Sequence, residues 1–226
     1  MIKIEKTETF GWEAAIRGMR NPRESWEKSD TNWEKYTSGK DICRCIGEND
    51  LNLMKKLVAA GTDHRKFMRM IVVCLDIAAP LYWWKEMDTY KVGTVANSCS
   101  TMHKIADKEL TLEDFSFEHL RTDTSDFMDG SLAPFSALNM LEDTITIINT
   151  YRECYLETKD KEYWWQMIQL LPTSYNQRRM VMLNYEVLTN IYKSRKNHKL
   201  DEWRDFCKWI ESLPYSELIT GGDANG

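Results

Sequence analysis

Two stretches of the sequence hold most of the side chains that could do chemistry. The first, His64 to Ile105, combines the basic cluster HRKFMR with a loop rich in Gly, Ser, Thr and Asn. The second, Leu170 to Glu211, carries several Arg and Lys residues. Hydroxyl groups, loop amides and cations are the groups that bind a phosphate or carbonyl ligand. We therefore predict that the two stretches together form one nucleotide-type pocket.

Other kinds of site find little support in the sequence. It contains no GxGxxG fingerprint, Walker loop, HExxH motif or GxSxG motif. Cys99 and His103 would meet if they lay on a helix, but the Gly and Ser residues around them disfavour a helix, so a Cys-His nucleophile is a minor alternative. The close pair Cys43 and Cys45 lacks a second pair or a nearby His at zinc spacing. We predict no metal site.

The composition restricts the kind of protein. The 226 residues are 42% hydrophobic and include 9 Trp, 10 Tyr and 7 Phe, which is enough for one sizeable core. The formal net charge of -5 argues against broad nucleic-acid binding. The sequence has no apolar window of membrane-spanning length and starts without a signal-peptide pattern. The six cysteines are therefore expected to be reduced thiols in a cytoplasmic protein without membrane contacts.

The periodicity of apolar residues predicts one helix-dominated α/β domain over residues 1–219, followed by a disordered tail over 220–226. Residues 70–79 are rich in β-branched side chains and are expected to form a buried strand or a buried helix. The expected helices are Phe10–Arg20, a helix capped by Asn49 or Asp50 and stopped by Gly61, a helix from Pro80, residues 138–157, Glu162–Leu171, Gln177–Lys193 with Asn184 at its centre, and Leu200–Ser212.

The second stretch resembles the C-terminal part of the flavin-dependent thymidylate synthases. The residues that carry this resemblance are Leu171-Pro172, Tyr175, Asn184, Leu188, Arg195, Glu202 and Arg204. In the first stretch, Gly61, His64 and the Asn-x-x-Ser step from Asn97 to Ser100 are similar to other family motifs, and Arg17 is similar to an early Arg. The resemblance implies an α+β fold, a helix-rich single domain with an antiparallel sheet.

The resemblance also implies ligands and roles. FAD would supply the hydride, and a one-carbon unit would be transferred to a uridine-type, dUMP-like nucleotide, so no protein nucleophile is needed. Arg195 would polarise the pyrimidine carbonyls as the catalytic residue. Ser100, Arg178 and Arg195 would bind the substrate, and the cofactor-side residues would be His64, Arg69, Asn97 and Asn184. Without the resemblance, Arg195 reads equally well as a basic helix C-terminus, and Asn97 and Ser100 as ordinary turn residues.

The central signature of the family departs in this chain. Where the family has Arg-His-Arg, the sequence has Glu86-Met87-Asp88, and Met102 stands in place of a final Arg. Two carboxylates beside a phosphate would repel it, and one lost charged contact costs on the order of 2 kcal/mol. Other cations could serve instead: Arg65, Lys66, Arg69, Lys91, Arg178 and Arg195.

Three hypotheses follow. The chain is a diverged flavin-dependent enzyme, or a non-catalytic nucleotide- or partner-binding protein that kept the fold, or a helical protein whose resemblance is accidental. Tyr82, Trp83 and Trp84 cannot all point the same way on a helix, so one of them is expected to face another subunit or a flat ligand. The resemblance implies a homo-oligomer, a tetramer or a dimer.

Overall fold

A four-stranded antiparallel sheet with the strand order β1-β2-β4-β3 is the central element of the computed structural model, which describes residues 1–35, 42, 45–123 and 136–221. The strands are β1 (Lys3–Phe10), β2 (Val72–Pro80), β3 (Val95–Ser98) and β4 (Asn176–Asn184). The helix-rich fold with an antiparallel sheet, implied by the resemblance, is confirmed. This sheet argues against an accidental resemblance.

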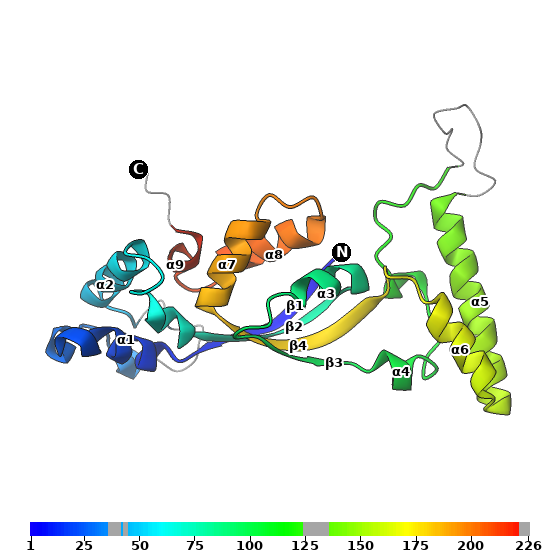
Figure 1. Cartoon of the computed structure of the whole chain (residues 1–226), viewed down its shortest axis with the longest axis horizontal. Coiled ribbons are helices and arrows are strands. Elements are labelled where there is room, and N and C mark those ends of the chain that lie inside the picture. Colours follow the sequence, from blue (N-terminus) through cyan, green and yellow to red (C-terminus); the bar gives the residue numbers. More distant parts are fainter. Residues whose placement is uncertain (36–41, 43–44, 124–135, 222–226) are drawn as a thin grey trace. The chain divides into compact units, whose positions relative to one another are not determined.

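Along the chain, helices of different lengths lie between the strands and after the last one (Figure 1). The α-helices are α1 (Trp12–Arg20), α2 (Glu48–Ala59), α3 (Leu81–Met87), α4 (Thr101–Lys104), α5 (Ala137–Thr158), α6 (Lys161–Leu170), α7 (Tyr185–Arg195), α8 (Asp201–Glu211) and α9 (Glu217–Thr220). The 3-10 helices are η1 (Asn21–Arg23), η2 (Trp26–Lys28), η3 (Trp33–Lys35), η5 (Lys66–Arg69) and η6 (Leu112–Asp114).

The chain divides into two compact units. Unit 1 comprises Met1, Ala78–Lys85 and Ser98–Arg178, and unit 2 comprises Ile2–Ile77, Glu86–Asn97 and Arg179–Gly226. Each unit is described by itself below.

Unit 1 has its core beside a helical hairpin. Helices α5 and α6 pack against each other, with Asp160 capping α6 through its side chain (Figure 1). The buried side chains of this core are Ile105, Leu110, Phe115, Leu141, Ile145, Ile148 and Met167. The predicted apolar stripe of residues 138–157 is thus confirmed, since Leu141, Ile145 and Ile148 all face the core.

The doubled Trp of α3 also belongs to unit 1 and is core. Trp83 and Trp84 are 0% and 1% exposed, and their rings meet edge to face with centroids 4.9 Å apart. The Trp84 indole donates to the backbone oxygen of Gln177 at 2.9 Å. The burial of both rings excludes Trp83 and Trp84 from facing a second partner, whereas Tyr82 is half-buried, so the expectation that one of the three aromatic side chains faces a partner stays a prediction.

Unit 2 forms its core around α7, which contacts α8 and α9 (Figure 1). Val73, Leu75 and Ile77 of β2 are buried at every second position, which decides between strand and helix for residues 70–79. The face of α1 predicted from its periodicity is confirmed, because Trp12, Ala15, Ile16 and Met19 are all buried. The Trp12 ring contacts Tyr185 of α7, with centroids 5.2 Å apart.

The predicted cap of α2 is wrong. The helix starts at Glu48, and Asp50 is a fully buried residue inside it. Its first turn is instead capped from a distance by Asp30, whose carboxylate accepts from the amides of Asn49 and Asp50 at 2.9 and 3.1 Å. Asp50 is free to point inward because another acid satisfies these amides.

The helix predicted over Gln177–Lys193 is wrong in its first half. Residues up to Asn184 form β4, in which Val181 and Leu183 are buried while Met180 is 43% exposed. Helix α7 begins only at Tyr185, and the Asn184 side chain is its N-cap, accepting from the Val187 amide at 3.0 Å. Asn184 therefore makes a capping hydrogen bond rather than a bond in the middle of a helix.

We expect the substitution Asn184→Ala to lower the free energy of unfolding by about 1 kcal/mol, because the Val187 amide loses its acceptor. Urea denaturation measures the change. The matched control is Asn190→Ala, at an exposed position inside the same helix, where alanine has the higher helix propensity and no loss is expected. Equal stability of the two variants would contradict the capping role.

At the C-terminus, Thr220, the first residue of the predicted tail, is the last residue of α9, and Ile219 is 1% exposed. The rest of the predicted tail, beyond Gly221, lies outside the described residues. The extent of the domain over 1–219 stays a prediction.

Candidate functional site

The guanidinium of Arg195, the predicted catalytic residue, is held on several sides within unit 2. Its Nε donates to Tyr90 Oη at 2.9 Å, and its Nη1 donates to Glu86 Oε2 at 2.6 Å. The guanidinium carbon lies 4.7 Å from the centroid of the Trp203 ring and 5.7 Å from that of Tyr90. These contacts fix the plane of the cation.

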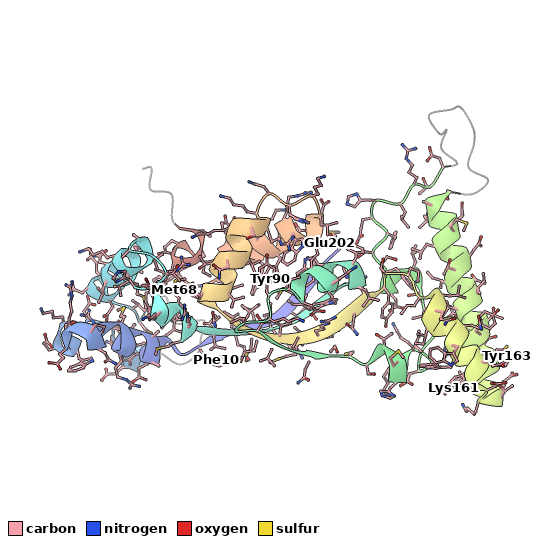
Figure 2. The ribbon with its side chains drawn as sticks, viewed as in Figure 1. Phe10, Met68, Tyr90, Lys161, Tyr163 and Glu202 are labelled. Carbon is pink, nitrogen blue, oxygen red and sulfur yellow. The ribbon has the colours of Figure 1, made fainter. Side chains whose placement is uncertain are left out.

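Local structure explains how these groups meet. Helix α7 ends at Arg195, and the turn that follows is held by Arg204, which donates to the backbone oxygens of His198 and Lys199 at 2.8 and 3.0 Å. Helix α8 then starts at Asp201 and buries Trp203 in its first turn, next to the buried Glu202. Figure 2 labels Glu202 and Tyr90.

Glu86 is the acceptor at the centre of this cluster. Its Oε2 accepts from Arg195 and, at 2.9 Å, from the Trp203 indole, and it lies 3.5 Å from His198 Nε2. All these contacts use the same oxygen. Among the described residues, Glu86 Oε1 accepts no hydrogen bond and Arg195 Nη2 donates none. The side chains are 34% and 18% exposed, so both groups are accessible to a ligand.

The second acid at the signature positions is also paired. Asp88 Oδ1 accepts from Arg179 Nη1 at 2.8 Å. Sequence reasoning expected Glu86 and Asp88 to repel an anion. In unit 2 each one instead neutralises an arginine, so the local charge is close to balanced rather than strongly negative.

The other predicted site residues of unit 2 lie outside the Arg195 cluster. His64 and Arg69 are exposed and lie between α2 and β2, with Arg69 at the end of η5. Asn97 is exposed on β3. Asn184 lies close to Gly93, which has a φ of +80° and where a Cβ would come within 3.0 Å of Asn184 Nδ2. The left-handed conformation favours glycine there, and a Cβ would also press on the Asn184 side chain.

Ser100 and Arg178 belong to unit 1. The Ser100 hydroxyl caps the short helix α4 by accepting from the His103 amide at 3.3 Å, so its turn role is the one that the structure contains. Arg178 is exposed, and its backbone oxygen accepts from the Cys99 amide at 2.9 Å. Because these residues fall in a different unit from Arg195, their predicted joint pocket stays a prediction.

The minor alternatives gain no support. Cys99 precedes α4, so it does not share a helical face with His103. Cys45, Cys74, Cys99, Cys154 and Cys207 are free thiols, while Cys43 lies outside the described residues. In the described part of the chain no group of three metal-binding side chains is found, and no helix there is long and apolar enough to cross a membrane.

A separate cavity of about 480 Å³ lies in unit 2 among α2, α7 and α9. Its lining consists of apolar and small residues, three cations, one acid and a threonine: Val58, Ala59, Leu218, Ile219, Gly221, Lys55, Arg65, Lys193, Glu217 and Thr189. Arg65 is committed to the buried Glu186, with Nη2 donating to Oε1 at 3.0 Å. Arg65, one of the alternative cations predicted from the sequence, lines this cavity, whereas the residues predicted to bind the substrate and the cofactor do not.

Sequence reasoning missed three members of the Arg195 cluster. Tyr90 follows α3 in a turn and Trp203 reads as one more apolar residue of the last helix, so neither shows a local signal. Glu86 stands out only as a departure from the family signature. It lies 109 residues from Arg195 in the sequence, and only the folded chain pairs the two.

The chain has the fold of several solved nucleotide-binding proteins. Two crystal structures of the flavin-dependent thymidylate synthase ThyX from Helicobacter pylori, each with FAD and dUMP, are 17% and 16% identical to it, with TM-scores of 0.64 and 0.65. The similarity covers 98% and 99% of this chain and 98% of each of those chains.

The UMP/dUMP methylase PolB from Streptomyces cacaoi, solved with 5-Br UMP, is 13% identical with a TM-score of 0.61 over 98% of this chain and 94% of its own. No protein-family model and no curated protein matches the sequence.

The residues at the signature positions do not fit the phosphates of a flavin dinucleotide. Glu86 and Asp88 are acids held by arginines, and Met87 is a 3% exposed apolar side chain. In unit 2 the predicted cofactor-side residues that could approach an anion are the exposed His64 and Arg69. These positions therefore do not supply the positive charge that a flavin dinucleotide phosphate needs.

Proposed function

We propose that this chain binds a uridine-type nucleotide, dUMP-like or UMP-like, with Arg195 as the residue that contacts the base. In the first of two candidate functions, called the catalytic form below, the protein would also bind FAD through groups other than Glu86, Met87 and Asp88, and would transfer a one-carbon unit to the pyrimidine. We further propose a cytoplasmic homo-oligomer, dimer or tetramer, that binds neither membranes nor nucleic acids.

The observation that carries the proposal is the state of Arg195. Its charge is balanced by Glu86, so the pair suits a neutral carbonyl better than a phosphate, which needs uncompensated positive charge. Tyr90, Glu86 and Trp203 hold the guanidinium in one orientation, which reduces the entropy lost when a ligand binds. Uracil offers two carbonyl oxygens to such a donor.

The solved proteins with this fold support the ligand class. Those structures contain dUMP in ThyX and 5-Br UMP in PolB, which are both uridine-type nucleotides. The substrate-side residues Ser100 and Arg178, and the cofactor-side residues His64, Arg69, Asn97 and Asn184, remain part of the proposal.

A specific observation favours the second candidate, a nucleotide-binding protein without flavin chemistry. The two acids in place of the family's Arg-His-Arg each form an ion pair with an arginine, in the pairs Glu86–Arg195 and Asp88–Arg179. A site that has exchanged cations for these pairs retains donors for a base and loses charge for a dinucleotide phosphate.

Two measurements on the purified protein test the proposal. The absorption spectrum after incubation with FAD and gel filtration reports flavin binding, and titration calorimetry with dUMP and UMP reports nucleotide binding. We expect Arg195→Ala to weaken nucleotide binding about tenfold to a hundredfold, because a donor held by charge is lost. Lys193→Ala, an exposed cation two residues away, is the matched control.

The outcomes separate the two candidates. Flavin retained through gel filtration together with nucleotide binding supports the catalytic form, which transfer assays would then follow. Nucleotide binding without flavin supports the second candidate. A protein that binds neither UMP nor dUMP overturns the proposed function.

A further inference from the structure

The unused polar atoms of the Arg195 cluster are of two complementary kinds. A carboxylate oxygen can only accept, and a guanidinium nitrogen can only donate. Glu86 Oε1 and Arg195 Nη2 are both without a partner among the described residues, and their side chains are joined by the 2.6 Å bond between Oε2 and Nη1. An acceptor and a donor therefore stand on adjacent, mutually fixed groups.

We propose that Glu86 and Arg195 together recognise the imide edge of a uracil base, with Glu86 Oε1 accepting from the ring N3–H while Arg195 Nη2 donates to a neighbouring carbonyl. This inference rests on the proposed function and names the chemical group that the site selects. It gives the acid at a signature position a role in specificity, at a place where the family has a cation.

The surroundings of Glu86 support this role. Three groups face its Oε2, namely the Arg195 guanidinium, the Trp203 indole and the His198 ring, so this oxygen is saturated. The fixed Oε2 leaves Oε1 as the accessible acceptor of a 34% exposed side chain. A bound base would cover this acceptor, and a covered acceptor without a donor is unfavourable, so a base lacking N3–H would be disfavoured.

The decisive probe is 3-methyl-dUMP, which keeps both carbonyls and lacks the N3 proton. We expect the unmodified protein to bind dUMP at least about tenfold more tightly than 3-methyl-dUMP in titration calorimetry. Glu86→Ala should weaken dUMP binding and bring the ratio of the two affinities close to 1. Glu86→Gln should also lose the preference, because the donors around Oε2 hold the single amide oxygen and turn its NH2, which can only donate, toward the ring N3–H.

Glu211→Gln is the matched control. Like Glu86, Glu211 is a carboxylate of unit 2 that accepts a hydrogen bond from a side chain, in its case from Tyr192 at 2.7 Å. This variant should leave the ratio unchanged. If dUMP binds but Glu86→Ala weakens both ligands equally, Glu86 only positions Arg195 and this inference is wrong. If the unmodified protein binds neither ligand, the proposed function itself fails.

Discussion

Replacing Arg20 with alanine is expected to lower the free energy of unfolding by about 3–5 kcal/mol, because it leaves the carboxylate of Asp50 buried without its cation. The two side chains are 4% and 0% exposed, and Arg20 Nε donates to Asp50 Oδ1 at 2.7 Å. Urea denaturation followed by circular dichroism measures the loss. Lys208→Ala, which breaks an exposed pair with Asp205, is the control and should change little.

The Asp50 carboxylate is saturated from both sides. Its Oδ2 accepts from the hydroxyls of Ser29 and Thr31, both at 2.6 Å, while Arg20 also donates to the backbone oxygens of Ser25 and Lys28. A double variant, Arg20→Met with Asp50→Leu, should lose less stability than Arg20→Ala because no charge remains buried. A loss in Arg20→Ala no larger than in Lys208→Ala would contradict this reading.

The same pair predicts a dependence on pH. Burial alone would raise the pKa of Asp50, but the hydrogen bonds from Ser29, Thr31 and Arg20 and the charge of Arg20 hold it below the ordinary value of 3.8. Stability from this group is therefore fully present above that ordinary pKa, and is lost as the pH falls through the lowered pKa of the folded state. Asp50→Asn should flatten this acid limb of the stability curve.

The buried Asp50 also shows what the sequence could not reveal. An acidic residue at the start of an apolar stripe is typical of a helix cap, and Asp50 has this position in the sequence. Only the folded chain brings Asp30 to the helix start and Arg20 to Asp50, over separations of 20 and 30 residues. Where one local pattern decides, as in the apolar faces of α1 and α5, the prediction from sequence is confirmed, whereas for β2 the sequence predicts burial and leaves strand and helix open.

The prediction of one helix over residues 177–193 is wrong for a related reason. Val181, Leu188 and Ile191 fit a helical stripe, but the run also alternates, and the structure buries Val181 and Leu183 as strand residues. Pairing with neighbouring strands overrode the helical pattern up to Asn184. In the candidate site, the resemblance selected Arg195, whereas its counter-ion Glu86 was expected to be an obstacle to binding. The charge pairing could not be foreseen, because it depends on the fold.

Substituting Trp203 with alanine is expected to remove about 3–5 kcal/mol of stability, since the indole is 0% exposed and its loss leaves a cavity. Its ring meets Tyr90, His198 and Phe206 with centroids 6.0 to 6.3 Å apart. Thermal unfolding monitored by calorimetry checks the result. Trp165→Ala makes the same chemical change at a 42% exposed position and should be nearly neutral.

Trp203→Phe separates packing from hydrogen bonding. It keeps a buried ring but removes the indole N–H that donates to Glu86, so the loss should be smaller, about 1–3 kcal/mol. Nucleotide affinity should fall as well, because Glu86 then has fewer donors fixing its Oε2 and the Arg195 guanidinium loses part of its aromatic support. A Trp203→Phe variant with lowered stability and unchanged affinity would show that the indole belongs to the core alone, and that Arg195 is oriented by Tyr90 and Glu86.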